Sequence, residues 1–212
     1  MITVWGRTTS SNVQAALWAL AEIGIDYERI DAGGAFGMVD TPEFKAMNPN
    51  SLVPVLRDGE MIIWESAAIV RYLGTRYGSE TFWPSDPVKR APLDMWAEWA
   101  KTTLVPALIG GLFFPLVRTR ESDRDPALVR ANAEKLKPIA RMLDARLSGV
   151  TFLGGEEPCF ADIMVATPLY RYFTLDFDRA DTPALSAYYE RLTQRPRYAE
   201  HVMVSYESLR VT

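Results

Sequence analysis

The sequence predicts a small α/β domain followed by an all-α domain, and two observations support this. In the first part of the 212 residues, short β-branched or aromatic segments alternate with amphipathic runs. Beyond a break at Phe82-Trp83-Pro84-Ser85-Asp86-Pro87, every periodic segment has the spacing of a helix. We therefore expect a first domain over residues 1–80, a linker over 81–87 and a helical domain over 88–212.

The first domain has the element order of a small mixed sheet. An amphipathic run from Val13 ends at Gly24, so a helix is expected between two strands, which makes a right-handed parallel unit. Asp58-Gly59 is a turn pair between two short apolar runs and predicts a hairpin. Together these elements predict a sheet of the thioredoxin kind. The expected strands are residues 2–5, 27–30, 53–56 and 61–64, and the closing helix is 67–77.

Helical periodicity continues through the second part of the chain. Its most apolar stretch, 104–117, contains Pro106 and Gly110 and is shorter than the ~20 residues that a membrane helix needs. We interpret this stretch as a bend in a buried helix and expect no membrane partner. The expected helices are 88–104 continuing bent to about 118, then 126–147, 160–173, 183–191 and 196–208.

The composition limits which partners and which cellular compartment we expect for this protein. The formal net charge is −4 at pH 7 and no Lys/Arg run stands out, whereas phosphate binding needs a clustered positive field, so nucleic acid is not expected. The single cysteine, Cys159, excludes an intrachain disulfide and fits a reducing compartment. The N-terminus has no basic start or signal-type apolar core. We expect a cytoplasmic protein.

Several enzyme classes are disfavoured by the residue inventory. His201 is the only histidine, so paired histidine ligands are excluded and no metal is expected. No G-x-S-x-G elbow is present, and a Ser-His or Cys-His device would have to use His201. The glycine-rich segment 33–37 matches neither a dinucleotide loop nor a phosphate loop, and we interpret it as a mobile connection.

Three polar segments remain as candidates for a ligand site. Thr8-Thr9-Ser10-Ser11-Asn12 offers five polar side chains where one helix cap would suffice, so an anion site at the helix N-terminus is the alternative to a cap. Leu52–Leu56 contains Pro54, for which an ordinary trans proline at a strand start is the simplest interpretation. Glu65 and Ser66 form either a cap or a second anion site, with Glu65 able to accept from an ammonium group. A ligand carrying a thiol, an amine and a carboxylate would suit the whole set.

Four segments of the sequence carry a resemblance to a known family. They are Ser10-Ser11-Asn12, Asn48-Pro49-Asn50-Ser51-Leu52-Val53-Pro54-Val55-Leu56, Glu65-Ser66-Ala67-Ala68-Ile69-Val70-Arg71-Tyr72-Leu73 and Phe160-Ala161-Asp162-Ile163. With these segments the chain resembles the cytosolic glutathione S-transferase family, in its bacterial type, over essentially its whole length. Asn-Pro, followed at this spacing by Val-Pro and then Glu-Ser-x-Ala-Ile, is a specific signature of the family. Any one of these motifs alone would be weak evidence. The resemblance implies glutathione as co-substrate, bound by the first domain, with no metal.

The resemblance also implies how glutathione would be held. Pro54 would be the family's cis-proline, which leaves the Val53 backbone free to pair with the cysteinyl unit like an added strand. Glu65 and Ser66 would hold the γ-glutamyl end. Leu52 replaces a glutamine that is common before Val-Pro in the beta and zeta classes, which would remove one contact with glutathione.

The catalytic group would come from the segment Ser10-Ser11-Asn12. Ser10 falls where theta- and zeta-class enzymes keep their catalytic serine. Asn12 falls where the beta class has cysteine and the nu class asparagine. The tyrosine of the alpha, mu and pi classes would fall near Gly6, so that mechanism is absent. Which of Ser10, Ser11 and Asn12 contacts the thiol stays open, and so does the class.

The implied chemistry is stabilisation of the glutathione thiolate. A free thiol has a pKa of about 8.5, so only a few per cent is ionised at neutral pH. Lowering this pKa by two units needs roughly 2.7 kcal/mol. A hydrogen bond to a charged group supplies about 1.5–3 kcal/mol, and a helix N-terminus adds about 0.3–1 kcal/mol. One hydroxyl and the helix end therefore suffice without a histidine.

The second substrate would be a small apolar electrophile bound between the domains. Trp96, Trp99 and Thr103 share a helix face and Phe113 follows them, so these residues are the candidates for its pocket. Aromatic residues at helical spacing are, however, more often part of a core. Cys159 stands where the family usually has Ser or Thr as a helix cap, and cysteine is a poor cap.

Other functions stay open beside conjugation. Asn12 suggests a glutathione-dependent disulfide or peroxide reductase. A non-catalytic transferase-like protein that binds ligands or partners is a second alternative, and an isomerase or lyase that uses glutathione as a cofactor is a third. The family is usually homodimeric, and a homodimer is expected here.

Overall fold

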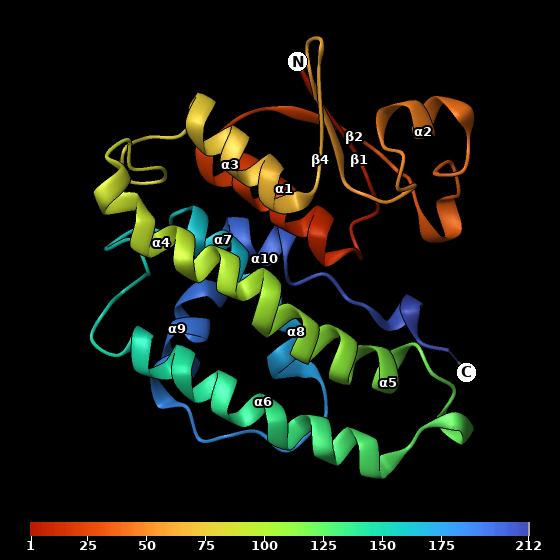
Figure 1. The fold of residues 1–212 in the computed structure, drawn as a ribbon, viewed down its shortest axis with the longest axis vertical. Coiled ribbons are helices and arrows are strands. Elements are labelled where there is room, and N and C mark those ends of the chain that lie inside the picture. Colours follow the sequence, from red (N-terminus) through yellow and green to blue (C-terminus); the bar gives the residue numbers. More distant parts are fainter. Residues whose placement is uncertain (212) are drawn as a thin grey trace.

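The computed structural model describes residues 1–211 and has the two-part architecture that the sequence predicts (Figure 1). A four-stranded mixed sheet with its helices forms the N-terminal part, and helices dominate the remainder. The expectation of a thioredoxin-like α/β domain before a helical domain is confirmed. The N-terminal elements are β1 (Ile2–Trp5), α1 (Ser11–Ile23), β2 (Tyr27–Ile30), η1 (Gly34–Phe36), α2 (Pro42–Met47), β3 (Val55–Asp58), β4 (Met61–Trp64) and α3 (Ser66–Tyr77).

The strand order in the sheet is β2-β1-β3-β4. β1 pairs parallel with β2, with Ile2 opposite Tyr27, and antiparallel with β3, with Ile2 opposite Asp58. β3 and β4 form the expected hairpin around Gly59, which has a φ of 60° that favours glycine. β4 is therefore an edge strand.

Side chains of β1 alternate between two apolar cores, as the pleat of a strand requires. Ile2 and Val4 belong to the large core that the sheet shares with α1 and α3. Trp5 lies in the second core, with Phe44 of α2 on the other face of the sheet. α1 and α3 therefore cover one face and α2 the other, as Figure 1 shows. The end of β1 is held between these layers, and the loop that follows it carries the candidate catalytic segment.

The helical part is built around one long helix that runs from Pro87 to Val117. Where we expected a bend, its hydrogen bonding changes to the π type from Ala100 onward, because Pro106 cannot donate to the preceding turn. The helical elements are α4 (Pro87–Trp99), η2 (Ala100–Leu104), η3 (Pro106–Phe113), α5 (Phe114–Val117), η4 (Glu121–Asp123), α6 (Pro126–Leu147), α7 (Phe160–Ala166), α8 (Leu169–Thr174), α9 (Pro183–Thr193), α10 (Pro196–His201) and η5 (Glu207–Leu209).

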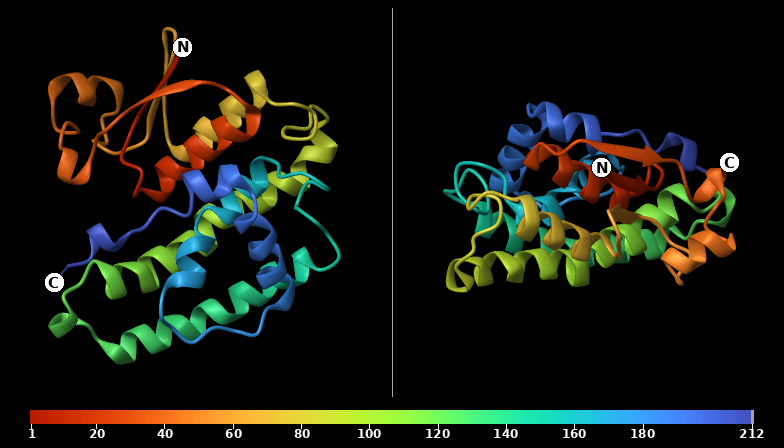
Figure 2. Two further views of the ribbon diagram at one scale, coloured as in Figure 1. Left: turned by 180° about the vertical axis from the view of Figure 1, so that it is seen from behind. Right: turned by 90° about the horizontal axis from the view of Figure 1, so that it is seen from above.

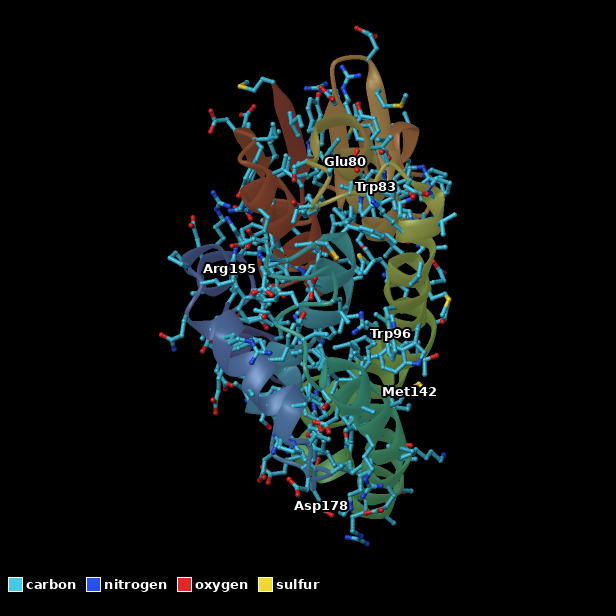
Figure 3. All side chains as sticks on the ribbon, turned by 90° about the vertical axis from the view of Figure 1, so that its left-hand side faces the viewer. Glu80, Trp83, Trp96, Met142, Asp178 and Arg195 are labelled. Atoms are coloured by element: carbon cyan, nitrogen blue, oxygen red, sulfur yellow. The ribbon has the colours of Figure 1, made fainter. Side chains whose placement is uncertain are left out.

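By length and composition alone, this 31-residue helix could cross a membrane. Core helices of globular proteins pass the same test, and here the helix packs against α7 and α6 within the helical part. Figure 3 shows Trp96 along this helix, farther from the sheet than Trp83. The C-terminal segment returns to the end of the same helix, where the Val211 amide donates to the Val117 carbonyl at 3.0 Å (Figure 2).

Several expected boundaries are wrong, and three of them concern the elements around the proposed site or the C-terminal segment. The helix expected over 160–173 is divided, because Pro168 has no N–H to donate and α8 begins only after it. The strand expected from residue 53 begins at Val55, after a cis peptide bond between Val53 and Pro54. The last helix ends at His201 instead of 208.

The cysteine at the start of α7 is compensated by Asp162. This carboxylate is fully buried and accepts hydrogen bonds from the backbone amides of Cys159 and Leu153, both at 2.9 Å. The Tyr188 hydroxyl donates to it as well, at 2.7 Å. The helix start is thus held by Asp162, and Cys159 needs only its backbone N–H for this contact.

Candidate active site

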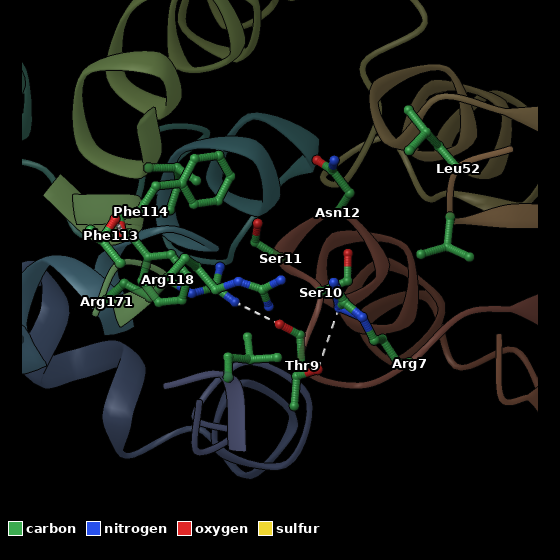
Figure 4. Close-up of a pocket in the computed structure, with 14 residues that line it drawn as sticks. Arg7, Thr9, Ser10, Ser11, Asn12, Leu52, Phe113, Phe114, Arg118 and Arg171 are labelled. Atoms are coloured by element: carbon green, nitrogen blue, oxygen red, sulfur yellow. Dashed lines mark hydrogen bonds between the residues drawn. The ribbon is translucent and has the colours of Figure 1, made fainter. Parts of the chain in front are cut away.

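A cavity of about 620 Å³ lies where the two parts of the molecule meet, beside the N-terminus of α1 (Figure 4). The loop after β1 and the first turn of α1 form one wall, and the C-terminal half of the long helix forms another. α8 and the C-terminal segment complete the wall. Its apolar lining consists of Leu52, Val53, Ile109, Phe113, Phe114 and Leu209.

Ser10 occupies the N-cap position of α1, yet its hydroxyl does not cap the helix. The hydroxyl makes no hydrogen bond within residues 1–211, and Ser10 lines the cavity together with Ser11. The loop is held in another way, since the Gln14 amide donates to the Thr8 carbonyl at 2.8 Å. A hydroxyl at a helix N-terminus is therefore available to an anion in the cavity.

Asn12 is tied into a polar cluster that joins three helices. Its Oδ1 accepts hydrogen bonds from the Ser66 hydroxyl of α3 at 3.1 Å and from Lys101 Nζ of η2 at 3.0 Å. Lys101 Nζ also lies 3.2 Å from the Ser66 hydroxyl. Burial lowers the pKa of Lys101, while Glu65 and Glu98 act in the opposite direction. Lys101 had no recognisable motif in the sequence, because its role arises from packing between α1, α3 and η2.

The backbone around Val53 is presented by a preorganised loop. Asn48 is 2% exposed, and its amide group donates to the Leu52 carbonyl at 2.8 Å while its Oδ1 accepts from the Asn50 backbone at 3.0 Å. The Val53–Pro54 peptide bond is cis. Val53 makes no backbone hydrogen bond within residues 1–211 and precedes the first residue of β3, so an extended ligand could add to the sheet there.

Glu65 and Ser66 stand at the start of α3. Glu65 has a φ of 70°, an uncommon value for a residue with a side chain, and its carboxylate is exposed. Ser66 is 1% exposed and is the first residue of the helix. The helix N-terminus and Lys101 together favour a negative charge here, and Glu65 favours a positive one.

Of the four residues predicted for the electrophile pocket, the structure brings only Phe113 to this cavity. Trp96, Trp99 and Thr103 are not among its lining residues, because they lie nearer the start of the long helix. Trp96 and Trp99 pack against the core and against each other, with ring centroids 5.0 Å apart. Phe114, the neighbour of Phe113 in the sequence, also lines the cavity.

Three arginines that sequence analysis missed also line the cavity: Arg7, Arg118 and Arg171. They come from the loop after β1, the end of the long helix and α8, so no short sequence motif predicts that they lie together. Arg7 fits against the backbone because residue 34 is glycine, where a Cβ would approach its Nε to 2.7 Å. Within residues 1–211, none of the three forms an ion pair.

No group of three His, Cys, Asp or Glu side chains among residues 1–211 is arranged to hold a metal ion. Cys159 is buried, and burial raises its pKa well above the usual range, so its thiol is poorly placed to react.

Comparison with known proteins shows which family the chain belongs to. Residues 1–75 match the family model described as the glutathione S-transferase N-terminal domain, and residues 104–196 match that of the C-terminal domain. The chain belongs to the glutathione S-transferase family. The family expected from the sequence motifs is confirmed.

Individual relatives match almost end to end. The chain is 41% identical to glutathione S-transferase GstB of Escherichia coli, covering 96% of this chain and 99% of that one. Glutathione S-transferase 4 of Zea mays is 32% identical, covering 92% and 89%. A theta-class glutathione S-transferase from Xanthomonas axonopodis pv. citri, solved with glutathione bound, is 40% identical with a TM-score of 0.90, covering 96% and 98%.

Proposed function

We propose that this chain conjugates glutathione to an electrophile, with Ser10 donating a hydrogen bond to the glutathione thiolate. The observation that carries the proposal is the position of Ser10. Its hydroxyl has no hydrogen-bond partner within residues 1–211, and Ser10 lines the cavity at the N-terminus of a 13-residue helix. Family membership, and a relative of 40% identity solved with glutathione bound, support glutathione as the co-substrate.

Glutathione would extend from Val53 toward Ser66. Its cysteinyl unit would pair with the free backbone of Val53, and its γ-glutamyl carboxylate would meet Lys101 and the N-terminus of α3. Glu65 would accept from the ammonium group. Asn12 would then act as a positioning residue, because its Oδ1 already accepts from Ser66 and Lys101.

The energies agree with this assignment. Moving a thiol pKa from about 8.5 to about 6.5 requires roughly 2.7 kcal/mol. A hydroxyl hydrogen bond to the thiolate supplies about 1.5–3 kcal/mol, and the positive end of α1 adds about 0.3–1 kcal/mol. The guanidiniums of Arg7 and Arg171 line the same cavity and act in the same direction.

The test is the ultraviolet thiolate band of bound glutathione, titrated with pH. In Ser10→Ala we expect the band to move toward the free-thiol range and kcat/KM to fall about 10- to 100-fold. Ser10→Thr retains a hydroxyl and is expected to recover much of this loss, while Ser11→Ala is the matched control. An unchanged band in Ser10→Ala with loss in Asn12→Ala would transfer the role to Asn12. No bound thiolate below the free-thiol range in the wild type would favour a non-catalytic binding protein.

We also propose that residues 1–80 and 88–212 are separate domains and that the protein is a cytoplasmic homodimer. The edge strand β4 supports a dimer, because Met61, Ile62 and Trp64 on it are 52%, 41% and 38% exposed. Light scattering on the eluted protein tests this, and a single species of 23.9 kDa would exclude the dimer.

A further inference from the structure

The cavity concentrates positive charge that nothing in residues 1–211 neutralises. Arg7, Arg118 and Arg171 all line it and none has a carboxylate partner. Burial is the main cause that lowers the pKa of Arg7 and of Arg171, and repulsion adds to it, from Arg118 on Arg7 and from Arg7 on Arg171. Like charges gathered in a cavity are unfavourable unless an anion joins them.

Arg171 is the most constrained of the three. It is 4% exposed, its Nη2 donates to the Thr9 carbonyl at 2.8 Å, and its guanidinium lies 4.7 Å from the ring centroid of Phe113 (Figure 4). Its Nε is buried and has no hydrogen-bond partner in the part of the chain that the structure describes. Burial, with a smaller effect of Arg7, lowers its pKa to about 10, so it remains charged at neutral pH.

Arg7 and Arg118 are the two whose guanidiniums are freest. Among residues 1–211, the Arg7 side chain has only a long contact of 3.4 Å to the Thr9 hydroxyl, and its buried Nε has no hydrogen-bond partner. The Arg118 side chain is exposed and makes no hydrogen bond or ion pair within residues 1–211. Planar guanidiniums of this kind bind carboxylates through paired hydrogen bonds.

We propose that the second substrate is an electrophile with an apolar body and a carboxylate, whose carboxylate is bound by Arg7 and Arg118 while Arg171 supplies fixed positive charge behind them. The proposal rests on the proposed function, because it places the reacting carbon beside the thiolate at Ser10. Phe113, Phe114 and Ile109 provide the apolar wall for the body. The expected substrate is therefore an amphipathic acid, where sequence analysis indicated only an apolar electrophile.

A matched pair of substrates tests this directly: 4-chloro-3-nitrobenzoate, which is anionic, and the neutral 4-chloro-3-nitrobenzamide. In both, the thiolate attacks the carbon that bears chlorine, the C–S bond forms, and chloride leaves with the electrons of the C–Cl bond. The proton lost from the thiol goes to solvent. Each enzymatic kcat/KM is divided by the uncatalysed rate with glutathione at the same pH, which removes the intrinsic difference in reactivity.

We expect the wild type to prefer the carboxylate over the amide in this normalised ratio. Arg118→Gln is the first variant, because its side chain is exposed and makes no hydrogen bond or ion pair within residues 1–211, so we expect the variant to fold. Arg7→Gln is the second. Each is expected to lower the carboxylate-to-amide ratio about 10- to 100-fold, the equivalent of one charge-assisted hydrogen bond. Arg141→Gln is the control, since Arg141 is exposed on α6 and does not line the cavity.

The alternatives give different results. If the arginines hold a carboxylate of glutathione itself, both variants raise the KM for glutathione with the two electrophiles alike and leave the ratio unchanged, which overturns the proposal. If they act only on the thiolate, both substrates lose rate equally, which also overturns it. If the wild type turns over both substrates but shows no preference for the carboxylate over the amide, the proposal is rejected, while the transferase activity stands. A wild type inactive on both while binding no glutathione thiolate rejects the proposed function.

Discussion

The two ends of the cavity are built in different ways. The end proposed to bind glutathione draws on short contiguous segments: Asn48 shapes the loop that presents Val53, which lines the cavity, and Ser66, outside the cavity lining, is the first residue of α3. The electrophile end is assembled from single residues far apart in the chain, and Arg171 lies 162 positions from the Thr9 carbonyl that it contacts. A sequence motif can therefore predict the contiguous segments, whereas the electrophile end forms only when the chain has folded.

This difference also explains which residues sequence analysis found. A loop or helix N-terminus has a local signature, because the caps and turns that form it depend on neighbouring residues. A guanidinium that points into a cavity has no such signature, because the residues around it come from elements far apart in the chain. If the two ends are independent, a substitution at one end should change the KM of the substrate bound there and leave the KM of the other substrate unchanged.

Of the three predictions that compare the two ends, the largest effect is expected from the loop at the end proposed to bind glutathione. Asn48→Ala removes the donor to the Leu52 carbonyl and the acceptor of the Asn50 backbone amide. The loop that presents Val53 then loses the two hydrogen bonds that hold its conformation. We expect about a tenfold higher KM for glutathione and a free energy of unfolding lower by about 2 kcal/mol. Asn50→Ala keeps the backbone contact and is the control, measured by the same kinetics and by denaturant titration. A change confined to the electrophile KM would show that the two ends are not separable.

A smaller effect, with a distinctive pH dependence, is expected at Lys101. Burial lowers its pKa below the ordinary 10.5, so the proton is lost as pH rises toward that value, and the neutral amine no longer attracts a carboxylate. Binding of S-methylglutathione, which has no thiol to titrate, should therefore weaken with rising pH below 10.5 in the wild type.

Two variants at the same position isolate this effect by calorimetry. Lys101→Arg retains charge and should not show the additional alkaline loss. Lys101→Met should bind about three- to tenfold more weakly at neutral pH, as loss of a partly buried ionic hydrogen bond implies. Identical pH profiles for the wild type and Lys101→Arg would contradict the assignment.

The smallest effect is expected at the apolar wall of the electrophile end. Phe114 lines the cavity and is 52% exposed, so Phe114→Ala should leave stability nearly unchanged while raising the electrophile KM about three- to tenfold, the value of one aromatic contact. Trp96→Phe is the comparison, because Trp96 packs outside the cavity and should leave that KM unchanged. The reverse result would restore the pocket that helical periodicity suggested.

Helix and strand positions were largely predictable, and the exceptions are instructive. Helix 126–147 was predicted with the bounds that the structure shows, because Pro126 at its start and a long amphipathic pattern are local signals. The break at Pro168 has a local cause that the helical periodicity hid, whereas the start of β3 at Val55 depends on pairing with β1, which no window of sequence contains.

By itself, the sequence determined the fold class and the family, because periodicity, caps and contiguous motifs are properties of neighbouring residues. The glutathione contacts that it suggested at Val53, Pro54, Glu65 and Ser66 stay a prediction. The sequence also placed Ser10 at a helix N-terminus. Only the tertiary structure decided that the Ser10 hydroxyl is free, that Asn12 is tied to Ser66 and Lys101, and that three arginines share one cavity. The physical reason is that hydrogen-bond partners and electrostatic neighbours are set by distance in space, and residues such as Arg7 and Arg171 approach each other only once the sheet and the helices have packed.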